Sequence, residues 1–457
     1  MKNDIQQTEV TIIGTGLTGL SLAHKLKKQG KKVLLVERNA QTGGVIGTQE
    51  KEGFIYETGP NTGVLSTPDI VELIEELSDD CTLATANKKA NKRLILKNGK
   101  WHALPSGLIS AVTTPLFTFK DKLRVLAEPF RAKGKNPHES LADLVKRRLG
   151  KSFLDYAIDP FIGGIYAGDP EKIIPKYALP KLYNLEQNYG SFIKGAVKKA
   201  KEPKSIREQK ATKEVFAVKG GLKHLVDALE KSIGSENIIL NARQTVVMPN
   251  ENGYEIRIDT NSGDSHTIHS SKVVSTVGAY RLQTLFPFLT EEELAPVTNL
   301  RYAPITLATV GFKKWTGRKL DAFGGLIPSK EGKKILGILF PSAIFDDRAP
   351  EGGAMLSAFI GGIRQPDAIN MSDDEIKQTV FNDIRETLDT ENPQPDVFEI
   401  FRYKHAIPQY EISSAQRLEA IANIEEKYPG LLLAGNIRDG IGMADRVKQA
   451  FEIASEL

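Results

Sequence analysis

The chain has 457 residues, a length that corresponds to about two to four domains of ordinary size. Its 61 Lys and Arg against 57 Asp and Glu leave a net charge of +4, which does not indicate a nucleic-acid partner. Cys81 is the single cysteine and the seven histidines form no HExxH pattern, so we predict no disulfide framework and no metal. No apolar run is long enough to span a membrane, and the N-terminus is polar. We therefore expect a cytoplasmic protein, soluble or peripheral on a membrane.

A glycine-rich turn follows the first apolar stretch, residues 9–13. It reads Gly14-Thr15-Gly16-Leu17-Thr18-Gly19, opens a helical pattern over 20–26, and is followed by a second apolar strand that ends at Glu37. In such a unit the first glycine allows a tight turn, the second admits a diphosphate, and the third lets helix and strand pack closely. The acid is placed to bind a ribose hydroxyl, and its charge disfavours the 2′-phosphate of NADP. The unit predicts dinucleotide binding, with FAD and NAD both open.

The next segment favours FAD. Gly43-Gly44 is followed by Thr48 and then by the turn Glu57-Thr58-Gly59-Pro60-Asn61. This order of motifs resembles the flavin-containing amine oxidase superfamily, and the resemblance implies non-covalently bound FAD. Gln41 departs from the family pattern, which usually has arginine there, so FAD binding is expected to rely more on backbone N–H groups.

A second strand-to-helix turn stands near the C-terminus. The buried-strand pattern of residues 431–436 leads into 439–443 and a helix, and residues 273–278 resemble a returning strand of the same superfamily. In these flavoproteins the C-terminal turn directs backbone N–H groups at the flavin, where they stabilise its anionic reduced form. The resemblance implies that FAD is bound by Gly14, Thr15, Gly16, Leu17, Thr18, Gly19, Glu37, Arg38, Gly44, Val45, Gly59, Pro60, Asn61, Thr62, Thr245, Val246, Ile441, Gly442 and Met443.

The expected architecture is α/β: a Rossmann-like FAD-binding domain of the amine-oxidase (GR2) type, a mixed-sheet substrate domain and a helical insert. We assign residues 1–80, 214–280 and 415–457 to the first, 81–104 and 281–414 to the second, and 105–213 to the third. The pair Asn98-Gly99 predicts a hairpin turn between two short strands. A strand-rich block is expected at 305–313, 322–328, 335–340, 354–361 and 397–402.

The stretch Phe161-Ile-Gly-Gly-Ile-Tyr-Ala-Gly-Asp-Pro170 is the most specific in the chain. It resembles a motif of the protoporphyrinogen oxidase family, and further matches follow in order at 324–331, 336–340, 345–350, 359–362 and 434–436. By this resemblance Arg93 pairs with a substrate propionate, which suits the fork of a guanidinium. The Gly164 carbonyl faces the pyrrole N–H groups, since a residue without Cβ allows that approach. The apolar side chains that sandwich the macrocycle are Leu326, Leu339 and Phe359.

The family implies FAD-dependent oxidation of protoporphyrinogen IX to protoporphyrin IX in heme biosynthesis. This is a six-electron reaction, with three hydride transfers to flavin N5 and reoxidation by dioxygen or a quinone. The sequence shows no obvious Ser-His-Asp, Cys-His or paired-carboxylate constellation. This agrees with a reaction whose redox chemistry is carried out by the cofactor. Asp169 is the acid nearest the central motif; a turn-forming role before Pro170 is favoured over that of a proton acceptor.

Other functions stay open at this stage. They are coproporphyrinogen III oxidation, another flavin oxidase or desaturase, and, as a non-enzyme, a binding protein like the escort and dissociation-inhibitor proteins that share this fold. The basic stretch 194–214 is interpreted as a solvated loop in preference to a contact with an anionic membrane. The helical insert nevertheless motivates peripheral association with the inner face of the cell membrane. A ferrochelatase is the expected recipient of the product, and a homodimer is left open.

Overall fold

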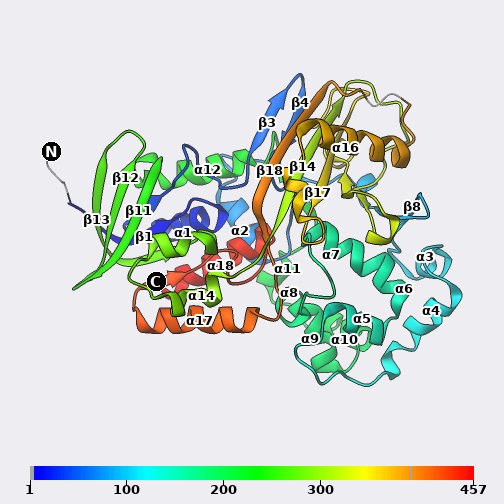
Figure 1. Ribbon diagram of the computed structural model, residues 1–457, viewed down its shortest axis with the longest axis horizontal. Helices are drawn as coiled ribbons and strands as arrows, with labels where there is room; N and C mark the ends of the chain where they lie inside the picture. Colours follow the sequence, from blue (N-terminus) through cyan, green and yellow to red (C-terminus); the bar gives the residue numbers. More distant parts are fainter. Residues whose placement is uncertain (1–4, 392–393) are drawn as a thin grey trace.

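The computed structural model describes residues 5–391 and 394–457. Three units lie side by side in Figure 1: a nucleotide-binding unit at the left, a second sheet at the upper right, and a group of helices at the lower right. The chain enters the first unit three times, since β1, the β10–β13 strands and β19 all join one sheet.

The nucleotide-binding sheet has the order β10-β2-β1-β13-β12-β11, with β19 beside β13. Its central strands β2, β1, β13 and β19 run parallel, and their apolar residues are buried on both faces, as is usual where helices cover a parallel sheet. The strands are β1 (Ile5–Ile13), β2 (Val33–Val36), β10 (Ile238–Ile239), β11 (Ala242–Asn250), β12 (Gly253–Thr260), β13 (Ser265–Ser275) and β19 (Leu431–Leu433).

Two groups of helices cover this sheet. One face packs in a core with the helices α1 (Leu17–Lys28), α2 (Pro68–Glu76), α12 (Lys223–Ile233) and α18 (Met443–Glu456). The other face packs in a separate core with α13 (Leu282–Leu285), α14 (Glu291–Thr298) and α17 (Ser414–Lys427).

The second sheet has the order β18-β14-β17-β16-β15-β7-β8. Its β7–β8 hairpin turns at Asn98 and Gly99, both with positive φ, as the Asn-Gly pair predicts. The predicted strand-rich block is confirmed. The strands are β7 (Arg93–Lys97), β8 (Lys100–Ala103), β14 (Tyr302–Phe312), β15 (Gly324–Leu326), β16 (Ile335–Leu339), β17 (Ala354–Gly361) and β18 (Val397–Pro408).

The two faces of this sheet differ in what covers them. Side chains alternate along a strand, and the set that includes Leu94, Val310, Ile338 and Ala358 forms a core with α16 (Asp373–Leu388). Figure 1 shows α16 over this outer face. The alternate residues therefore point to the opposite face, toward the nucleotide-binding and helical units.

Small sheets connect the units. A hairpin pairs β3 (Thr48–Lys51) with β4 (Phe54–Glu57), and β9 (Val215–Val218) pairs with both β5 (Gly63–Val64) and β6 (Leu83–Thr85). The strand β6 falls inside the range 81–104 that sequence reasoning gave to the substrate domain. Its partner β9 belongs to the first core, so the start of that range lies on the nucleotide-binding side.

The helical unit surrounds a buried ion network. Arg148, which is fully buried, donates to Glu186 (2.7 Å) and Glu128 (2.6 Å), and Glu128 also accepts from the Ser191 hydroxyl. Burying these charges is tolerated because each has an opposite partner and further hydrogen bonds. The helices are α3 (Leu108–Thr113), α4 (Phe119–Leu126), α5 (Leu141–Arg148), α6 (Lys151–Phe153), α7 (Asp159–Ile165), α8 (Pro175–Ala178), α9 (Pro180–Tyr189), α10 (Phe192–Ala200) and α11 (Ile206–Gln209).

The basic stretch 194–214 was predicted to be a loop, but parts of it are helical. Its first part completes α10, and Ser205 begins α11 with a capping box to Glu208. This pairing satisfies the N–H groups of the first helical turn and holds the lysines on ordered backbone. Among the described residues, no helix has both the length and the apolarity to cross a membrane.

Candidate active site

The main chain of the glycine-rich turn passes very close to itself between Gly14 and Gly19. A Cβ on Gly19 would lie 2.0 Å from the carbonyl oxygen of Gly14, so the third glycine is required for the helix to cross the strand end. A Cβ on Gly16 would meet nothing within 4 Å. Gly16 is also the N-cap of α1, where no side chain accepts from the free N–H groups and no acid stands in the first turn. The position is therefore open toward a ligand and suited to an anion.

Glu37 lies at the end of β2 beside this turn. Its buried carboxylate accepts from the Thr15 N–H (3.0 Å) and hydroxyl (2.7 Å) through one oxygen, and from the Asn39 N–H (2.9 Å) through the other. A carboxylate has about four lone-pair positions, so capacity remains for a ribose hydroxyl. The backbone of Glu37 also pairs with Ile239 and Ala242, which places that segment next to it.

Thr245 and Val246 lie further along β11, past the irregular register between Ala242 and Gln244. Their backbone groups pair with β12, opposite Ile258 and Arg257. The adenine contact inferred for them stays a prediction. The segment 239–242, which bonds directly to Glu37, is the one that the structure places beside the acid.

The Gly-Gly loop crosses the Gly59 turn at close range. A Cβ on Gly59 would lie 2.0 Å from the Val45 carbonyl oxygen, and one on Gly44 would lie 3.2 Å from the Gly16 Cα. Val45 keeps 54% of its surface exposed in spite of this crowded backbone. Gly16, Gly44, Val45 and Gly59 thus form one cradle lined by backbone, although they are far apart in sequence.

The C-terminal turn brings a second helix N-terminus to the nucleotide-binding unit. Gly442 caps α18, its N–H donates to Asp445 (3.2 Å), and Ile441 packs against the core of the helical unit. Gly435 has φ of +88° and donates to Gln449 (2.7 Å), which fixes the turn at the end of β19. Together with the open cradle, these groups fit an extended dinucleotide: the N-terminus of α1 for its diphosphate, Glu37 for its ribose.

The predicted substrate residues share one face of the second sheet. Residues 93, 324, 339 and 357 lie opposite one another on four adjacent strands, β7, β15, β16 and β17. Two positions along, Leu326, Gly337 and Phe359 form the next row on the same face. Leu326, Leu339 and Phe359 are half-buried, and Arg93 is exposed at the far end. Sequence-distant residues therefore build a flat apolar surface with one guanidinium at its edge.

Gly164 lies in α7, which Figure 1 places between this sheet and the other helices. A Cβ on Gly164 would lie 2.3 Å from Cδ2 of Leu326. The backbone of α7 therefore reaches the sheet face at Leu326, and its exposed neighbour Ile165 follows. The structure therefore brings Gly164 next to Leu326, and the roles of both toward a substrate stay a prediction.

Asp169 is engaged in an ion pair. Arg364 donates to it (2.9 Å), and it also accepts from the Glu171 N–H (3.1 Å). Burial raises the pKa of Asp169, but these hydrogen bonds outweigh burial and hold the pKa below its usual range. A carboxylate that is paired and weakly basic is a poor proton acceptor, so the structural role of Asp169 is favoured.

Sequence reasoning missed the contacts that join the two sides of the site. The Ser357 hydroxyl donates to the Asn61 side chain (2.8 Å), and the Tyr403 hydroxyl donates to the Thr58 carbonyl (2.6 Å). Both residues reach from the substrate sheet to the turn around Gly59. Their partners are far away in sequence, so no local pattern could reveal them.

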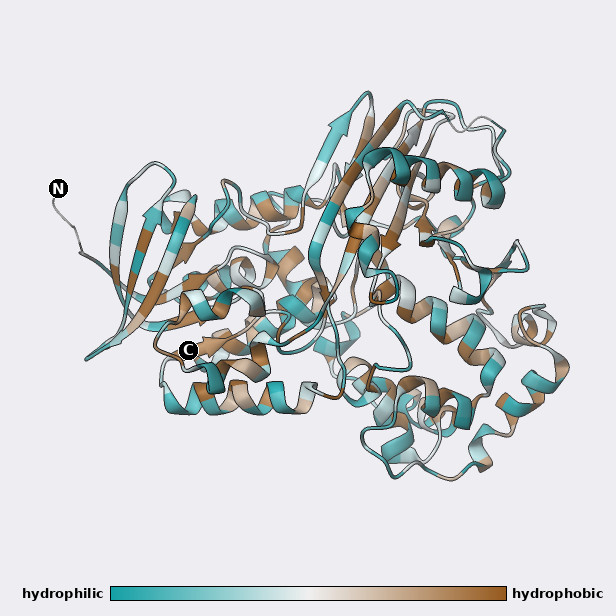
Figure 2. Ribbon diagram, in the orientation of Figure 1, coloured by the Kyte–Doolittle hydropathy of each residue, from teal (hydrophilic) through white to brown (hydrophobic). Residues whose placement is uncertain are grey.

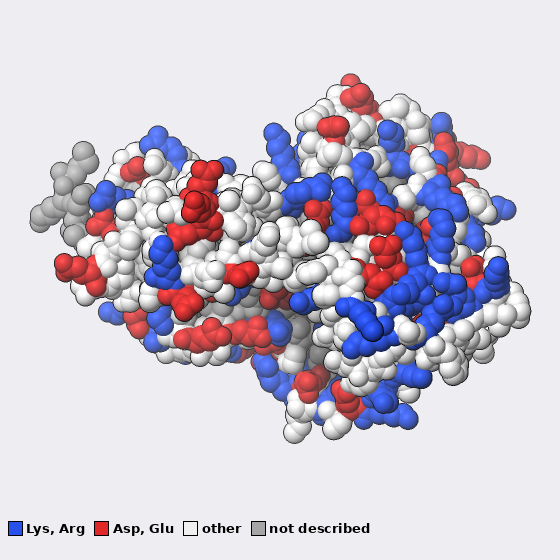
Figure 3. All heavy atoms as spheres, turned by 60° about the horizontal axis from the view of Figure 1, so that its bottom comes forward, with Lys and Arg blue, Asp and Glu red and all other residues white. Residues whose placement is uncertain are grey.

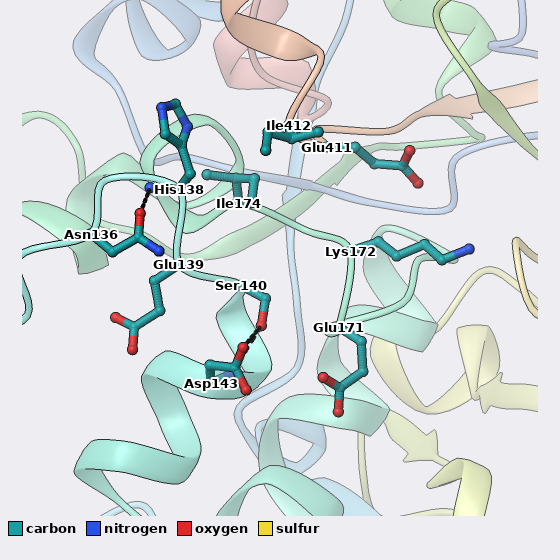
Figure 4. Close-up of a pocket in the computed structure, with 10 residues that line it drawn as sticks. All are labelled: Asn136, His138, Glu139, Ser140, Asp143, Glu171, Lys172, Ile174, Glu411 and Ile412. Atoms are coloured by element: carbon teal, nitrogen blue, oxygen red, sulfur yellow. Dashed lines mark hydrogen bonds between the residues drawn. The ribbon is translucent and has the colours of Figure 1, made fainter.

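A separate cavity of about 520 Å³ lies between the start of α5, the segment that follows α7 and the segment that follows β18. Figure 4 shows Asn136, Ser140 and Asp143 on one wall and Glu171, Lys172 and Glu411 on another. Its acids have partners of their own, as in the pairs of Asp143 and Glu171 with Lys146. The cavity shares no residue with the cradle or the substrate face, so it is not assigned to this site.

Comparison with known proteins identifies the family. The model of the family described as flavin containing amine oxidoreductase matches residues 17–450. Protoporphyrinogen oxidase 2 of Arabidopsis thaliana is 30% identical, with 97% of this chain and 92% of that protein covered. Coproporphyrinogen III oxidase of Bacillus subtilis is 24% identical, with 98% and 97% covered. A solved structure from Exiguobacterium sp. 255-15 superimposes with a TM-score of 0.79 at 22% identity, covering 99% and 98% of the two chains.

These findings confirm the resemblance drawn from the motifs, the α/β flavoprotein fold and FAD as the cofactor. The alternative of a binding protein without redox chemistry is disfavoured by them. The chain belongs to the flavin-containing amine oxidoreductase family and is an FAD-dependent oxidoreductase.

Proposed function

We propose that this protein oxidises protoporphyrinogen IX to protoporphyrin IX. The supporting observation is the row that runs from Arg93 through Leu339 to Ser357, whose hydroxyl bonds Asn61. The row crosses three strand spacings, about 14 Å at about 4.8 Å each. That length suits a tetrapyrrole lying flat, with a propionate at one end and its oxidised edge at the flavin turn.

The chain's own residues act by binding and orientation. Arg93 holds a propionate, and Leu326, Leu339 and Phe359 contact the face of the macrocycle that is turned toward the sheet. The Gly164 carbonyl accepts from pyrrole N–H groups. Bound FAD supplies the two-electron acceptor for each of the successive oxidations. Ser357 is buried and bonds Asn61 beside the Gly59 turn, and half-buried Phe359 packs with Ala303 and Ile305, so these residues exclude water from the reacting edge.

The polar groups along the face favour the substrate with two propionates over the one with four. Protoporphyrinogen carries its carboxylates on one edge, whereas coproporphyrinogen carries one on every pyrrole. At the end of the row opposite Arg93 the face presents Ser357 and then Thr309, both buried and uncharged. Carboxylates placed there would lose hydration without gaining a cationic partner.

The test is anaerobic mixing of the yellow protein with protoporphyrinogen IX. We expect flavin absorbance to bleach, and porphyrin fluorescence to rise when oxygen or a quinone is admitted. Coproporphyrinogen III under the same conditions is the comparison. A higher kcat/KM for coproporphyrinogen would overturn the choice of substrate, and no bleaching with either would overturn the function.

We also propose that the helical unit contacts an anionic membrane surface. Residues 105–213 contain 21 Lys and Arg against 11 Asp and Glu, although the whole chain carries only +4. Large apolar side chains are exposed on the same unit: Ile109 by 83%, Phe119 by 75%, Leu126 by 69% and Phe130 by 88%. Figure 2 shows apolar residues on the outer turns of α3 and α4, and Figure 3 shows Lys and Arg gathered over this side of the molecule. Apolar residues with surrounding cations suit insertion at a lipid interface.

Vesicle flotation tests this contact, with phosphatidylglycerol-rich vesicles against purely zwitterionic ones. Binding to the anionic vesicles should weaken with salt and with the double substitution Phe119→Ser/Phe130→Ser. The control is Ile206→Ser, which also replaces an exposed apolar residue but lies on α11. Equal recovery of protein and variant with both vesicle types would overturn the proposal.

A further inference from the structure

An ion network outside the predicted site residues brackets Gly164. Asp159 begins α7, Gly164 lies within it, and Asp169 follows it. Arg364 donates one nitrogen to Asp159 and the other to Asp169 (2.9 Å). A single guanidinium therefore spans both ends of the segment whose middle carries Gly164.

The same network reaches the apolar row of the sheet. Asp159 accepts from the N–H of Ser329 (2.7 Å) and from its hydroxyl (3.1 Å), just beyond the end of β15, the strand that carries Leu326. Arg364 itself follows β17, the strand that carries Phe359. The elements bearing Gly164, Leu326 and Phe359 thus meet at one carboxylate and one guanidinium.

Backbone contacts also hold the turn after α7 against the segment that follows β17. Ile363 donates to the carbonyl of Ala167 (2.8 Å), and a Cβ on Gly362, whose φ is +84°, would lie 2.7 Å from that oxygen. Ala167 has φ of +48°, an uncommon conformation for a residue with a side chain. The turn after α7 is therefore held in place by the end of β17.

We propose that Arg364 is a positioning residue: it sets the distance between the α7 backbone at Gly164 and the sheet face at Leu326 and Phe359. The inference rests on the proposed function, because that distance is the width of the slot for the macrocycle. Arg364 keeps about a third of its side chain exposed (34%), whereas Asp159 keeps 8%. Removal of the guanidinium leaves a buried carboxylate without its cation, and α7 is then free to shift.

The first test compares Arg364→Ala with Arg402→Ala. Arg402 is a matched control, since it lies on β18 of the same sheet, is 32% exposed and pairs with one acid, Asp373 (2.6 Å). We expect Arg364→Ala to lower kcat/KM at least tenfold with FAD content unchanged, and Arg402→Ala to leave kcat/KM near that of the unsubstituted protein. Arg364→Lys should lie between, because an ammonium cannot span both carboxylates. Equal kcat/KM for the two alanine variants would overturn the proposal.

The pH profile distinguishes positioning from a general loss of stability. In the folded protein the pKa of Asp169 lies below its usual range, so the pair is intact above that lowered value and is lost as pH falls through it. Arg364→Ala has no pair to lose, so the difference in kcat between this variant and the unsubstituted protein should be largest above the lowered pKa of Asp169 and should shrink as pH falls through it. The charged groups around the pair are Lys146, Lys151, Asp155, Glu171, Lys172 and Lys330. They are common to all variants, so a difference in kcat that stayed constant as pH falls through the pKa of Asp169 would contradict the proposal.

A measurement without substrate separates this inference from the proposed function. Hydrogen exchange of the amides of residues 163–168 should accelerate in Arg364→Ala relative to Arg402→Ala, with the β1–α1 segment unchanged. If Arg364→Ala fails to fold, Asp169→Asn replaces it, since this change removes one arm of the bridge and keeps the size. Unchanged exchange over 163–168 would overturn the positioning role, even if porphyrinogens proved not to be substrates.

Discussion

The two sides of the active site are made in different ways. The flavin side is made of backbone, because Gly19, Gly44 and Gly59 bring main-chain atoms so close that an added Cβ would meet another main-chain atom within about 3.2 Å. The substrate side is made of side chains that alternate along sheet strands, and their far ends can move. Backbone contacts cannot relax when crowded, whereas side chains can adopt other rotamers. Substitutions of these glycines on the flavin side should therefore abolish FAD binding. Substitutions on the substrate side should change kcat/KM or KM by intermediate amounts.

Gly19→Ala is expected to have the largest effect. The new Cβ would lie 2.0 Å from the Gly14 carbonyl oxygen, and neither backbone segment can withdraw without separating α1 from β1. The purified variant should show no flavin absorbance. Gly107→Ala is the control, since a Cβ there meets nothing within 4 Å and φ is −165°. Flavin absorbance in the purified Gly19→Ala variant would contradict the proposed difference between the flavin side and the substrate side.

Gly164→Ala should reduce activity while leaving FAD bound. The contact is 2.3 Å but falls on Cδ2 of Leu326, the mobile end of a side chain. Overpacking of this kind costs about 1–3 kcal/mol, so kcat/KM should fall about five- to 150-fold. Gly163→Ala is the neighbouring control, since a Cβ there meets no protein atom within 4 Å. The double change Gly164→Ala/Leu326→Ala should restore part of the loss; absence of any recovery would argue against steric crowding.

Arg93→Ala should raise KM with a smaller change in kcat. Loss of a charge-assisted hydrogen bond costs about 1–3 kcal/mol, and the exposure of Arg93 places the expected effect at the lower end of that range. The KM should therefore rise about five- to tenfold. Lys92→Ala is the adjacent control, because Lys92 is paired with Asp321 (2.7 Å) and not with substrate. An equal rise in KM for both variants would remove Arg93 from the site.

The contrast also explains what the sequence could reveal. The flavin side was predictable, since its tight turns require glycine at fixed local spacing and Gly14, Gly16 and Gly19 show that spacing. The substrate side was identified only through resemblance. From their own sequence, Leu339 and Phe359 are ordinary strand residues, and the strand pairing alone brings them beside Arg93.

Contacts between distant elements could not be predicted. Arg364 lies 205 and 195 residues from its two carboxylate partners, and no pattern around it marks it as different from other surface arginines. The stretch 194–214 is a different case, because a usable signal was present. Ser205 and Glu208 form an S-x-x-E capping box, which indicates a helix start within a segment that composition alone assigned to a loop.

The smallest effect is expected far from the site, at the surface pair that joins α14 to α17. Lys427 donates to Glu293, and this hydrogen bond, with that of the Thr290 N–H, lowers the pKa of Glu293 to about 2. The pair therefore stabilises the fold above the unfolded pKa of about 4.5, and this contribution is lost as pH falls from there toward 2. Glu293 keeps 19% of its side chain exposed and Lys427 keeps 59%, so the pair lies at the surface and Glu293→Gln should lower the free energy of unfolding by only about 0.2–1 kcal/mol at pH 7. The difference in Tm from the unsubstituted protein should shrink as the pH is lowered to about 3, with FAD content and kcat/KM unchanged. A difference that grew at acid pH would show that the ion pair is not its source.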